Sequence, residues 1–313
     1  MKIVIVGPGA MGCLTAAALA HKTKEEVWLL DHQEARAKIL TESGISVEGI
    51  NGPFRANVRA NADPAHIGAA DLAIICTKSY STEDACRHIK ELVGNKTSIL
   101  TLQNGIGNVQ IIADYFGEDQ VLGGITNHGA TLLGIGRVRH AGKGDTIIGR
   151  LDGKVTGFLR TVQDIFTKAG FETKLSKDIE SVIWSKLIIN VGINALTAVT
   201  RLHNGMLVQY DGTRELLKSA VSEAVKISKR KRIKLFYDDP IQKVESVCAA
   251  TAGNISSMLQ DVLAAKRTEI DYINGAMVRQ GKSLGIPTPV NDVLTHLVKT
   301  IETTYEKQLF KKE

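Results

Sequence analysis

The sequence has few of the residues that hold small secreted proteins or metal centres together. It contains four cysteines, none of them in a CxxC or other metal-ligand spacing, namely Cys13, Cys76, Cys86 and Cys248. We therefore expect free thiols in a reducing cytoplasm, and no metal site. No uninterrupted apolar run approaches the roughly 18 residues needed to span a bilayer. The N-terminal stretch MKIVIVGPGAMG lacks the basic region and cleavage site of a signal peptide, so we expect no membrane partner.

An excess of acidic charge is also missing. The net charge is +6, and much of it comes from KRKRIK (229–234) and the C-terminal KQLFKKE (307–313). A nucleic-acid-binding protein needs a recognisable module as well as a basic face, and the sequence offers no such module. A solvated helix end and a charged tail explain both segments. We expect no nucleic-acid partner, although a positive field suits a small anionic substrate.

The first part of the chain alternates strand-like and helix-like segments. The 313 residues are 43% hydrophobic, which is enough for two globular domains. Short β-branched runs predict strands at 2–6, 26–31, 71–77, 98–102 and 121–127. Helical patterns lie between them at 11–22, 81–93 and 108–116. This alternation predicts an α/β domain with a parallel sheet and helices on both faces.

The pattern changes at about residue 176. Glycines cluster between 123 and 157, where we expect turns and short antiparallel strands. Beyond them the strand signal fades, and helical patterns follow at 178–198, 212–231, 254–281 and 290–308. We therefore predict a dinucleotide-binding domain at 1–175 and an all-α substrate and catalytic domain at 176–313. The oligomeric state stays open, a homodimer included.

A glycine motif follows the first predicted strand directly and opens a helix. In GPGAMG (7–12), Gly7 permits a tight turn, Gly9 lets the backbone approach a pyrophosphate, and Gly12 allows close helix–strand packing. The phosphates then lie at the helix N-terminus, where free N–H groups and the helix dipole favour anions. The motif predicts a Rossmann-type site whose contacts are Gly7, Pro8, Gly9, Ala10, Met11 and Gly12.

Three further strand ends carry polar residues. Asp31 ends the second strand, where a carboxylate normally accepts hydrogen bonds from the adenosine ribose and favours NAD. Arg36, one helical turn later, is placed to reach the 2′-phosphate of NADP, so both cofactors stay open. Lys78 and Asn104 follow later strands, and ligands of open α/β sheets bind at such ends. We predict that both contact the cofactor, although a solvated lysine and a turn-forming asparagine are the alternatives.

The segment WSKLIINVGINAL (184–196) combines an apolar helix with a polar stripe. Lys186, Asn190 and Asn194 recur at i, i+4 and i+8, so they share one helix face. A helix this apolar is expected to be buried, and buried polar groups cost free energy unless they are satisfied. A second polar set lies at 254–278, with Ser257 and Glu269. Plain structural roles remain the alternatives: a surface lysine, interhelical amides, and a Glu269–Lys266 ion pair.

Several of these segments together resemble one known family. They are GPGAMG, the strand ends at Lys78 and Asn104, WSKLIINVGINALTA, and SSMLQDVLAAKRTEIDYINGAMV (256–278). Over essentially the whole chain, the sequence is similar to the ketopantoate reductase (2-dehydropantoate 2-reductase) family. Members reduce ketopantoate to pantoate with NADPH in pantothenate biosynthesis. They combine a Rossmann domain with a helical C-terminal domain.

The resemblance implies roles for individual residues. Lys186 matches the catalytic lysine that gives a proton to the forming alkoxide, and Glu269 matches the glutamate of the active cleft. The substrate-contacting positions are Asn190, Asn194, Asn204 and Ser257, and Ala130 joins the cofactor contacts. Asp31 departs from the family, because members that use NADPH often have a basic residue there. NADP is thus the family expectation, and NAD is suggested by Asp31.

The chemistry of 2-oxo acid reduction explains why such residues are needed. Hydride addition to the C2 carbonyl places negative charge on oxygen, and a lysine ammonium can stabilise that charge and release its proton. Burial lowers the pKa of a lysine whereas a nearby carboxylate raises it, so the sequence leaves the net direction open. The alternatives are a related reductase of another branched or aromatic 2-oxo acid, and a non-catalytic dinucleotide sensor.

Overall fold

A computed structural model describes residues 1–309, so the last four residues of the charged tail lie outside the described part. The chain forms two compact units. The first unit comprises Met1–Gln103 and Gly107–Val182, and the helical unit comprises Asn104–Ile106 and the chain from Ile183 onward. The division falls after Val182, later than the predicted 175. A Cβ on Gly149 would lie 3.1 Å from Ile179 Cβ, so the start of the next helix still packs on the first unit.

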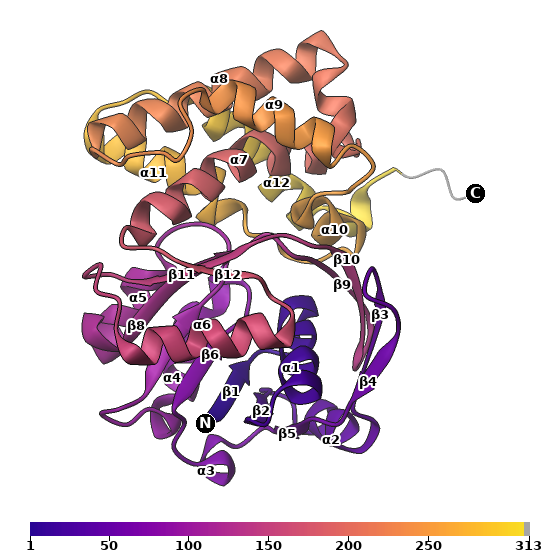
Figure 1. Cartoon of the computed structure of the whole chain (residues 1–313). Helices are drawn as coiled ribbons and strands as arrows, with labels where there is room; N and C mark the ends of the chain where they lie inside the picture. Colours follow the sequence, from indigo (N-terminus) through magenta and orange to yellow (C-terminus); the bar gives the residue numbers. More distant parts are fainter. Residues whose placement is uncertain (310–313) are drawn as a thin grey trace. The chain divides into compact units, whose positions relative to one another are not determined.

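The centre of the first unit is an eight-stranded sheet (Figure 1). Its strands are β1 (Lys2–Val6), β2 (Glu26–Leu30), β5 (Arg59–Asn61), β6 (Leu72–Ile75), β7 (Ser98–Thr101), β8 (Val121–Thr126), β11 (Thr146–Arg150) and β12 (Thr173–Leu175). They lie in the order β12-β11-β8-β7-β6-β1-β2-β5, and over the described residues the β8–β11 pair is the one antiparallel pair within this sheet. The strand order reverses between β1 and β6, which is the ligand-binding point of a doubly wound sheet. The predicted Rossmann-type architecture is confirmed.

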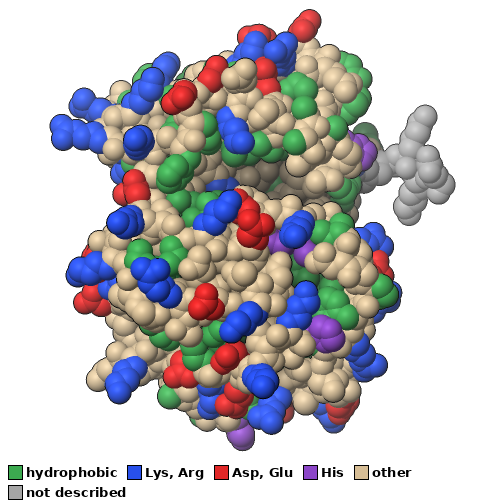
Figure 2. Space-filling model, viewed as in Figure 1, with side chains coloured by type: hydrophobic (Ala, Val, Ile, Leu, Met, Phe, Trp, Pro, Cys, Tyr) green, Lys and Arg blue, Asp and Glu red, His purple; other side chains and the backbone are tan. Residues whose placement is uncertain are grey.

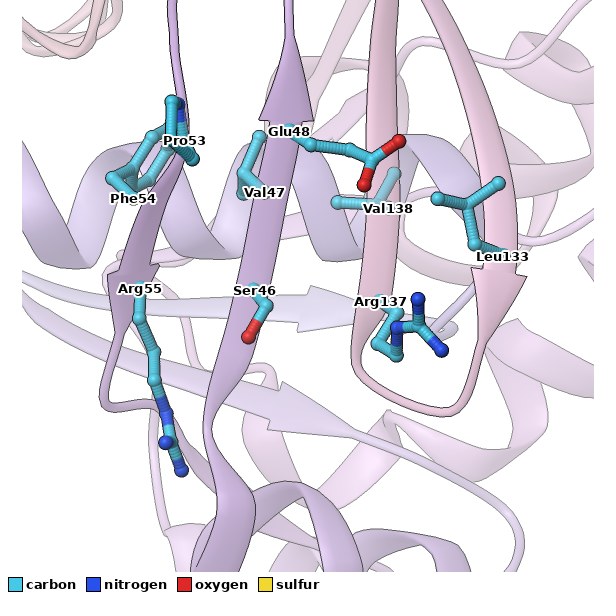
Figure 3. Close-up of a pocket in the computed structure, with 9 residues that line it drawn as sticks. All are labelled: Ser46, Val47, Glu48, Pro53, Phe54, Arg55, Leu133, Arg137 and Val138. Carbon is cyan, nitrogen blue, oxygen red and sulfur yellow. The ribbon is translucent and has the colours of Figure 1, made fainter.

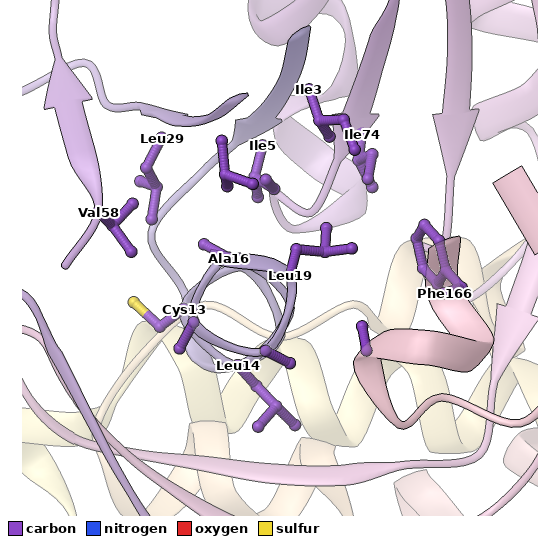
Figure 4. Close-up of a cluster of buried hydrophobic side chains, with 14 of the residues drawn as sticks. Ile3, Ile5, Cys13, Leu14, Ala16, Leu19, Leu29, Val58, Ile74 and Phe166 are labelled. Atoms are coloured by element: carbon purple, nitrogen blue, oxygen red, sulfur yellow. The ribbon is translucent and has the colours of Figure 1, made fainter. Parts of the chain in front are cut away.

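Alternate residues of each central strand enter different cores. Ile3 and Ile5 of β1 belong to one apolar cluster, whereas Val4 and Val6 belong to another on the opposite face. Helices cover both faces: α1 (Ala10–Lys22), α2 (Glu34–Ser43) and α6 (Gly157–Ala169) on the first, and α3 (Pro64–Ile67), α4 (Thr82–His88) and α5 (Asn108–Phe116) on the second. Figure 4 shows sheet residues converging on α1. Because both faces of the sheet are covered, the sequences of the central strands are continuous apolar runs.

A second, smaller sheet covers part of the α1 face. It contains β3 (Ile45–Gly49), β4 (Phe54–Ala56), β9 (Gly129–Gly134) and β10 (Arg137–Gly142), in the order β4-β3-β10-β9. Val47 and Val138 point inward to the same apolar cluster as α1. The antiparallel β9–β10 pair agrees with the glycine-rich strands predicted in this region, but β3 and β4 were not predicted.

The helical unit is built around a long apolar helix, α7 (Ile179–Thr200). The other helices are α8 (Asp211–Arg230), α9 (Pro240–Ala250), α10 (Ser257–Leu263), α11 (Asn274–Leu284) and α12 (Pro289–Thr303), with short 3-10 turns η4 (Asn204–Val208) and η5 (Ile270–Tyr272). A Cβ on Gly192 would lie 2.8 Å from both Val221 and Val244, so α7 approaches α8 and α9 closely there. This close contact explains a glycine in the middle of a helix.

By length and composition alone, α7 could cross a bilayer, and 72% of its most apolar 18-residue window is buried within the protein. The sequence analysis found no membrane-spanning run here, because Lys186 and two asparagines interrupt the apolar residues of this helix. A buried core helix passes the same test.

The predicted helix 254–281 is interrupted. Helix α10 ends at Leu263, Ala265 has φ +50°, and η5 precedes α11. The amide of Lys266 donates to the carbonyl of Asp261, which closes the end of α10. Ser257 and Glu269 therefore lie on different elements rather than on one helix.

Candidate active site

The glycine loop joins β1 to α1 and has the geometry that phosphate binding requires. Gly7 has φ +99°, and a Cβ on Gly12 would lie 1.9 Å from the Gly7 carbonyl oxygen. At Gly9, by contrast, the nearest atom to such a Cβ is the Cys76 carbonyl oxygen at 3.9 Å, and the residue is exposed. No side chain within the described chain caps the first turn of α1. Its N–H groups therefore fit a pyrophosphate.

Lys78 lies beside this loop at the carboxyl end of β6. The Gly7 Cβ position is 2.7 Å from Thr77 Cγ2, which places the two strand ends in contact. Gln103 at the end of β7 donates to the Thr77 carbonyl at 2.9 Å and to Thr82 Oγ1 at 2.9 Å. These bonds hold the Thr77–Ser81 turn that carries half-buried Lys78. Ala130 comes from the small sheet, in a strand that packs against α1.

Asp31 is placed differently from the simple sequence expectation. Its side chain is 0% exposed, and both carboxylate oxygens are bound by Arg36. The Gln33 amide also donates to Asp31 Oδ1 at 3.1 Å. The hydrogen bonds that Arg36 donates to Asp31 raise the pKa of Arg36 above its ordinary value. The Arg36 guanidinium is 27% exposed here, whereas the Asp31 carboxylate is fully covered.

The polar stripe lies on the least buried side of α7. Lys186 and Asn190 are half-buried and Asn194 is 5% exposed, whereas Leu187, Ile188 and Val191 are buried in the apolar cluster. These buried apolar residues hold the helix in the core of the helical unit, while Lys186 and Asn190 of the stripe remain partly exposed. The structure thus brings the predicted lysine and amides together on one face.

Two opposing effects act on the Lys186 ammonium. Burial lowers the pKa of Lys186 to about 8, and the charge of Glu269 opposes this shift. Desolvation therefore outweighs the carboxylate, which is the balance that the sequence left open. Glu269 itself is 5% exposed at the start of η5. An ammonium with a pKa near neutrality is suited to proton transfer.

Asn104 belongs to the helical unit although it follows a strand of the first. Its Nδ2 donates to Glu269 Oε2 at 3.4 Å, and the Ile106 amide donates to the Tyr272 carbonyl at 3.1 Å. Gly105 has φ +83°, and a Cβ there would lie 2.4 Å from that same carbonyl. Asn104 is therefore next to the predicted catalytic glutamate.

The predicted serine lies at the start of α10. Ser257 is half-buried, and the preceding Ser256 caps the helix by accepting from the Leu259 amide at 3.0 Å. Ser256 Oγ also lies 2.6 Å from Thr197 Oγ1 of α7. This pair was not predicted, although Thr197 continues the polar stripe one turn beyond Asn194. It ties the start of α10, which carries the predicted substrate residue Ser257, to the stripe.

Asn204 has a buried position at the start of η4. Its Nδ2 donates to Thr251 Oγ1 at 3.0 Å and its backbone amide to the Asn254 carbonyl at 3.0 Å. Its Oδ1 is buried and has no partner among the described residues. Asn204 thus holds the turn that leads into Ser256 and Ser257.

Outside the predicted site, the described residues carry scattered charges and free cysteines. Lys and Arg side chains occur over the whole face in Figure 2 with acidic ones between them, and the 229–234 residues other than Ile233 are exposed. Residues 1–309 contain no group of three or more His, Cys, Asp or Glu able to hold a metal. The cysteines are free, and burial raises the pKa of Cys13, Cys76 and Cys86 to about 12.

A separate hollow of ≈ 330 Å³ lies over the small sheet. It is lined from β3, β4, β9 and β10, with Arg55 and Arg137 beside Ser46 (Figure 3). None of its lining residues belongs to the predicted site.

Comparison with known proteins agrees with this geometry. Residues 3–153 match the family described as "Ketopantoate reductase PanE/ApbA", and residues 178–302 match its C-terminal counterpart. The chain is 36% identical to the 2-dehydropantoate 2-reductase of Halobacterium salinarum over 96% of this chain and 98% of that protein. A PanE/ApbA family ketopantoate reductase from Ralstonia eutropha JMP134 superposes with a TM-score of 0.89 at 31% identity, covering 98% of this chain and 100% of the other. A D-mandelate dehydrogenase bound to NADH and anilino(oxo)acetate gives 0.91 at 29% identity, with 98% and 100% covered. The chain therefore belongs to the ketopantoate reductase family.

Proposed function

We propose that this protein is a 2-dehydropantoate 2-reductase, which reduces the C2 carbonyl of ketopantoate to the hydroxyl of pantoate. The single observation that carries the proposal is the pairing of Lys186, whose pKa burial lowers to about 8, with the charge of Glu269 in the same unit. A plain surface lysine needs neither burial nor a carboxylate. The full-length match to the family's reductases adds to this.

Each residue of the proposed site has its own role in the reduction. Lys186 gives its proton to the oxygen that becomes negative when the carbonyl is reduced. Glu269 keeps the ammonium protonated near neutral pH, because its charge raises the pKa that burial lowers. Asn190, Asn194 and Ser257 orient the substrate carboxylate and hydroxyl by hydrogen bonds. Asn204 acts on the same site through the turn that it holds before Ser257.

The family uses NADPH, and the glycine loop fits a dinucleotide. When bound, the reduced nicotinamide supplies the hydride. The loop Gly7–Gly12 would hold the pyrophosphate against the start of α1, while Lys78, Asn104 and Ala130 would contact the nicotinamide half. Arg36 and Asp31 would face the adenosine ribose.

Two observations support a related function as the alternative. The D-mandelate dehydrogenase solved with NADH shares the whole architecture, and Asp31 is a residue typical of NAD-binding sites. In this alternative the chain reduces another branched or aromatic 2-oxo acid with NADH. A non-catalytic dinucleotide sensor would not need the Lys186–Glu269 pair, so it is disfavoured.

One kinetic experiment tests these functions against each other. The purified full chain is given ketopantoate or phenylglyoxylate, each with NADPH and with NADH, and loss of the reduced nicotinamide is followed by absorbance. We expect the highest kcat/KM with ketopantoate. A preference for phenylglyoxylate would instead support the alternative. If no 2-oxo acid is reduced with either cofactor while the dinucleotide still binds, the sensor is supported.

A further inference from the structure

Three buried polar side chains and one backbone carbonyl connect the helices of the helical unit. Asn274 and Asn291 are 0% exposed, and Glu223 is 6% exposed. Buried polar groups are expensive unless they are hydrogen-bonded, so a chain of them in an apolar core needs a reason. The fourth group is the carbonyl of Val191 in α7, where the chain of hydrogen bonds ends.

The first link is a helix cap supplied by another helix. Pro289 opens α12 and has no N–H, and the next two amides, of Val290 and Asn291, donate to the Glu223 carboxylate of α8 at 2.9 and 3.0 Å. A carboxylate at a helix N-terminus is also favoured by the helix dipole. Asn291 Nδ2 adds a third bond to Glu223 at 2.7 Å and donates to the Ala220 carbonyl at 3.0 Å. The side chain of Asn291 is therefore fixed from both sides.

The second link reaches α7. Asn291 Oδ1 accepts from Asn274 Nδ2 at 3.0 Å, and the same Nδ2 donates to the Val191 carbonyl at 3.1 Å. Both hydrogens of the Asn274 amide are thus used. Its Oδ1 is buried with no partner among the described residues, so the two donor bonds are what this amide contributes.

The series of hydrogen bonds connects the two segments that carry Lys186 and Glu269. Val191 lies five residues after Lys186 on α7, and Asn274 lies five residues after Glu269. The bond between them joins the helix that carries the lysine to the segment that carries the glutamate. We propose that Asn274, held by Asn291 and Glu223, is a positioning residue that fixes the Glu269 segment against the Lys186 helix. The proposal rests on the function proposed above for Lys186.

The charges at the site determine which readout is informative. Burial lowers the pKa of Lys186, and Glu269 is the carboxylate that raises it. If the Glu269 segment moves away, that opposing effect weakens and the pKa of Lys186 falls further. A protonated lysine is needed to donate the proton, so the alkaline limb of kcat/KM moves to lower pH. A merely structural loss of stability does not move this limb.

The test compares Asn274→Ala with Val298→Ala. Val298 is a fully buried residue of α12 outside the chain of polar bonds, so its truncation lowers stability without breaking the connection. We expect Asn274→Ala to lower kcat by roughly tenfold to a hundredfold, as small misplacements of reacting groups do. Its alkaline limb moves to lower pH, while Val298→Ala keeps the wild-type pH profile.

Two controls keep the outcome decisive. Glu223→Gln perturbs the other end of this series of hydrogen bonds and should shift the alkaline limb of kcat/KM to lower pH by a smaller amount. It replaces Asn274→Ala as the test if that variant does not fold. Lys186→Ala tests the proposed function separately. If Lys186→Ala loses turnover while Asn274→Ala and Glu223→Gln keep the pH profile of Val298→Ala, the positioning role is wrong and the proton-donor role stands. If Lys186→Ala keeps turnover, Lys186 is not the proton donor and the role proposed for it above is wrong.

Discussion

Asn104 and Glu269 lie 165 positions apart in the chain, yet Asn104 Nδ2 donates to Glu269 Oε2 at 3.4 Å. The contact depends on Gly105, whose φ of +83° and close approach to the Tyr272 carbonyl no other residue tolerates easily. The turn after β7 thereby becomes part of the helical unit. Glu269 is fixed on one side by this amide and acts on Lys186 through its charge.

The charge of Glu269 gives a prediction for the pH profile. Glu269→Gln keeps the side-chain size and an oxygen that can accept from Asn104, but it removes the charge that raises the pKa of Lys186. The wild-type kcat/KM should fall as pH rises through about 8, because the proton donor is then deprotonated. In the variant this fall should begin at lower pH. Steady-state kinetics over a pH series measures both, with exposed Glu215→Gln as the control. An unchanged alkaline limb would contradict the electrostatic role of Glu269.

Lys186 should also reduce the stability of the fold. Its folded-state pKa of about 8 is below the ordinary 10.5, so the unfolded chain binds more protons between these values and the free energy of unfolding rises with pH there. Below pH 8 the full desolvation cost is present. Lys186→Met should therefore stabilise the protein by on the order of 2–3 kcal/mol at pH 7, and the gain should shrink towards pH 10.5.

Turnover of the same variant should fall by roughly a hundredfold or more, because the proton donor is lost. Denaturant unfolding and binding of the reduced nicotinamide by fluorescence separate the two effects. Lys282→Met, at an exposed position of α11, is the control and should change neither. Loss of dinucleotide binding in Lys186→Met would show that the lysine holds the cofactor instead.

Much of the first unit was predictable because local pattern and global packing agree. In β1, alternate residues pack in two apolar clusters on opposite faces of the sheet. The run KIVIV is therefore apolar almost throughout, a pattern that predicts a buried strand. The glycine loop carries its own backbone requirement at Gly7 and Gly12. The stripe on α7 was visible because polar residues at helical spacing are conspicuous in an apolar run.

Other features depend on contacts that have no local signal. Ala265 breaks the predicted helix although alanine is the best helix former, and no Gly or Pro marks the break. The choice of Arg36 as partner for Asp31, and of Asn291 for Asn274, is made only when the chain folds. Polar residues in a sequence do not state which partner will satisfy them, so these positions required the structure.

A buried histidine pair predicts sensitivity to acid. His128 and His140 are 7% and 5% exposed, and His128 Nδ1 lies 2.9 Å from His140 Nε2. Burial and the charge of His140 lower the pKa of His128 to about 4 from 6.5. The unfolded chain therefore binds more protons between these values, so the free energy of unfolding falls as pH drops from 6.5 towards 4.

His128→Gln should reduce this dependence by about 1.4 kcal/mol per pH unit, the value for one proton. Denaturant unfolding over a series of pH values measures the slope. His203→Gln, at an exposed position, should keep the wild-type slope. If His128→Gln has the same slope as His203→Gln, the pair does not control acid stability.

The Asp31–Arg36 pair gives a prediction for cofactor choice that does not depend on turnover. In Arg36→Ala the guanidinium that covers Asp31 is removed, which leaves a carboxylate without its cationic partner Arg36. That carboxylate repels a 2′-phosphate and is free to accept hydrogen bonds from ribose hydroxyls. Binding of 2′,5′-ADP should weaken by roughly tenfold or more relative to 5′-AMP. Isothermal titration calorimetry measures both ligands on the same protein. Lys38→Ala removes a positive charge from an exposed position of the same helix and should leave the ratio of the two affinities unchanged. An equal change for both ligands in Arg36→Ala would mean that Arg36 supports the fold of this edge and does not discriminate between the two cofactors.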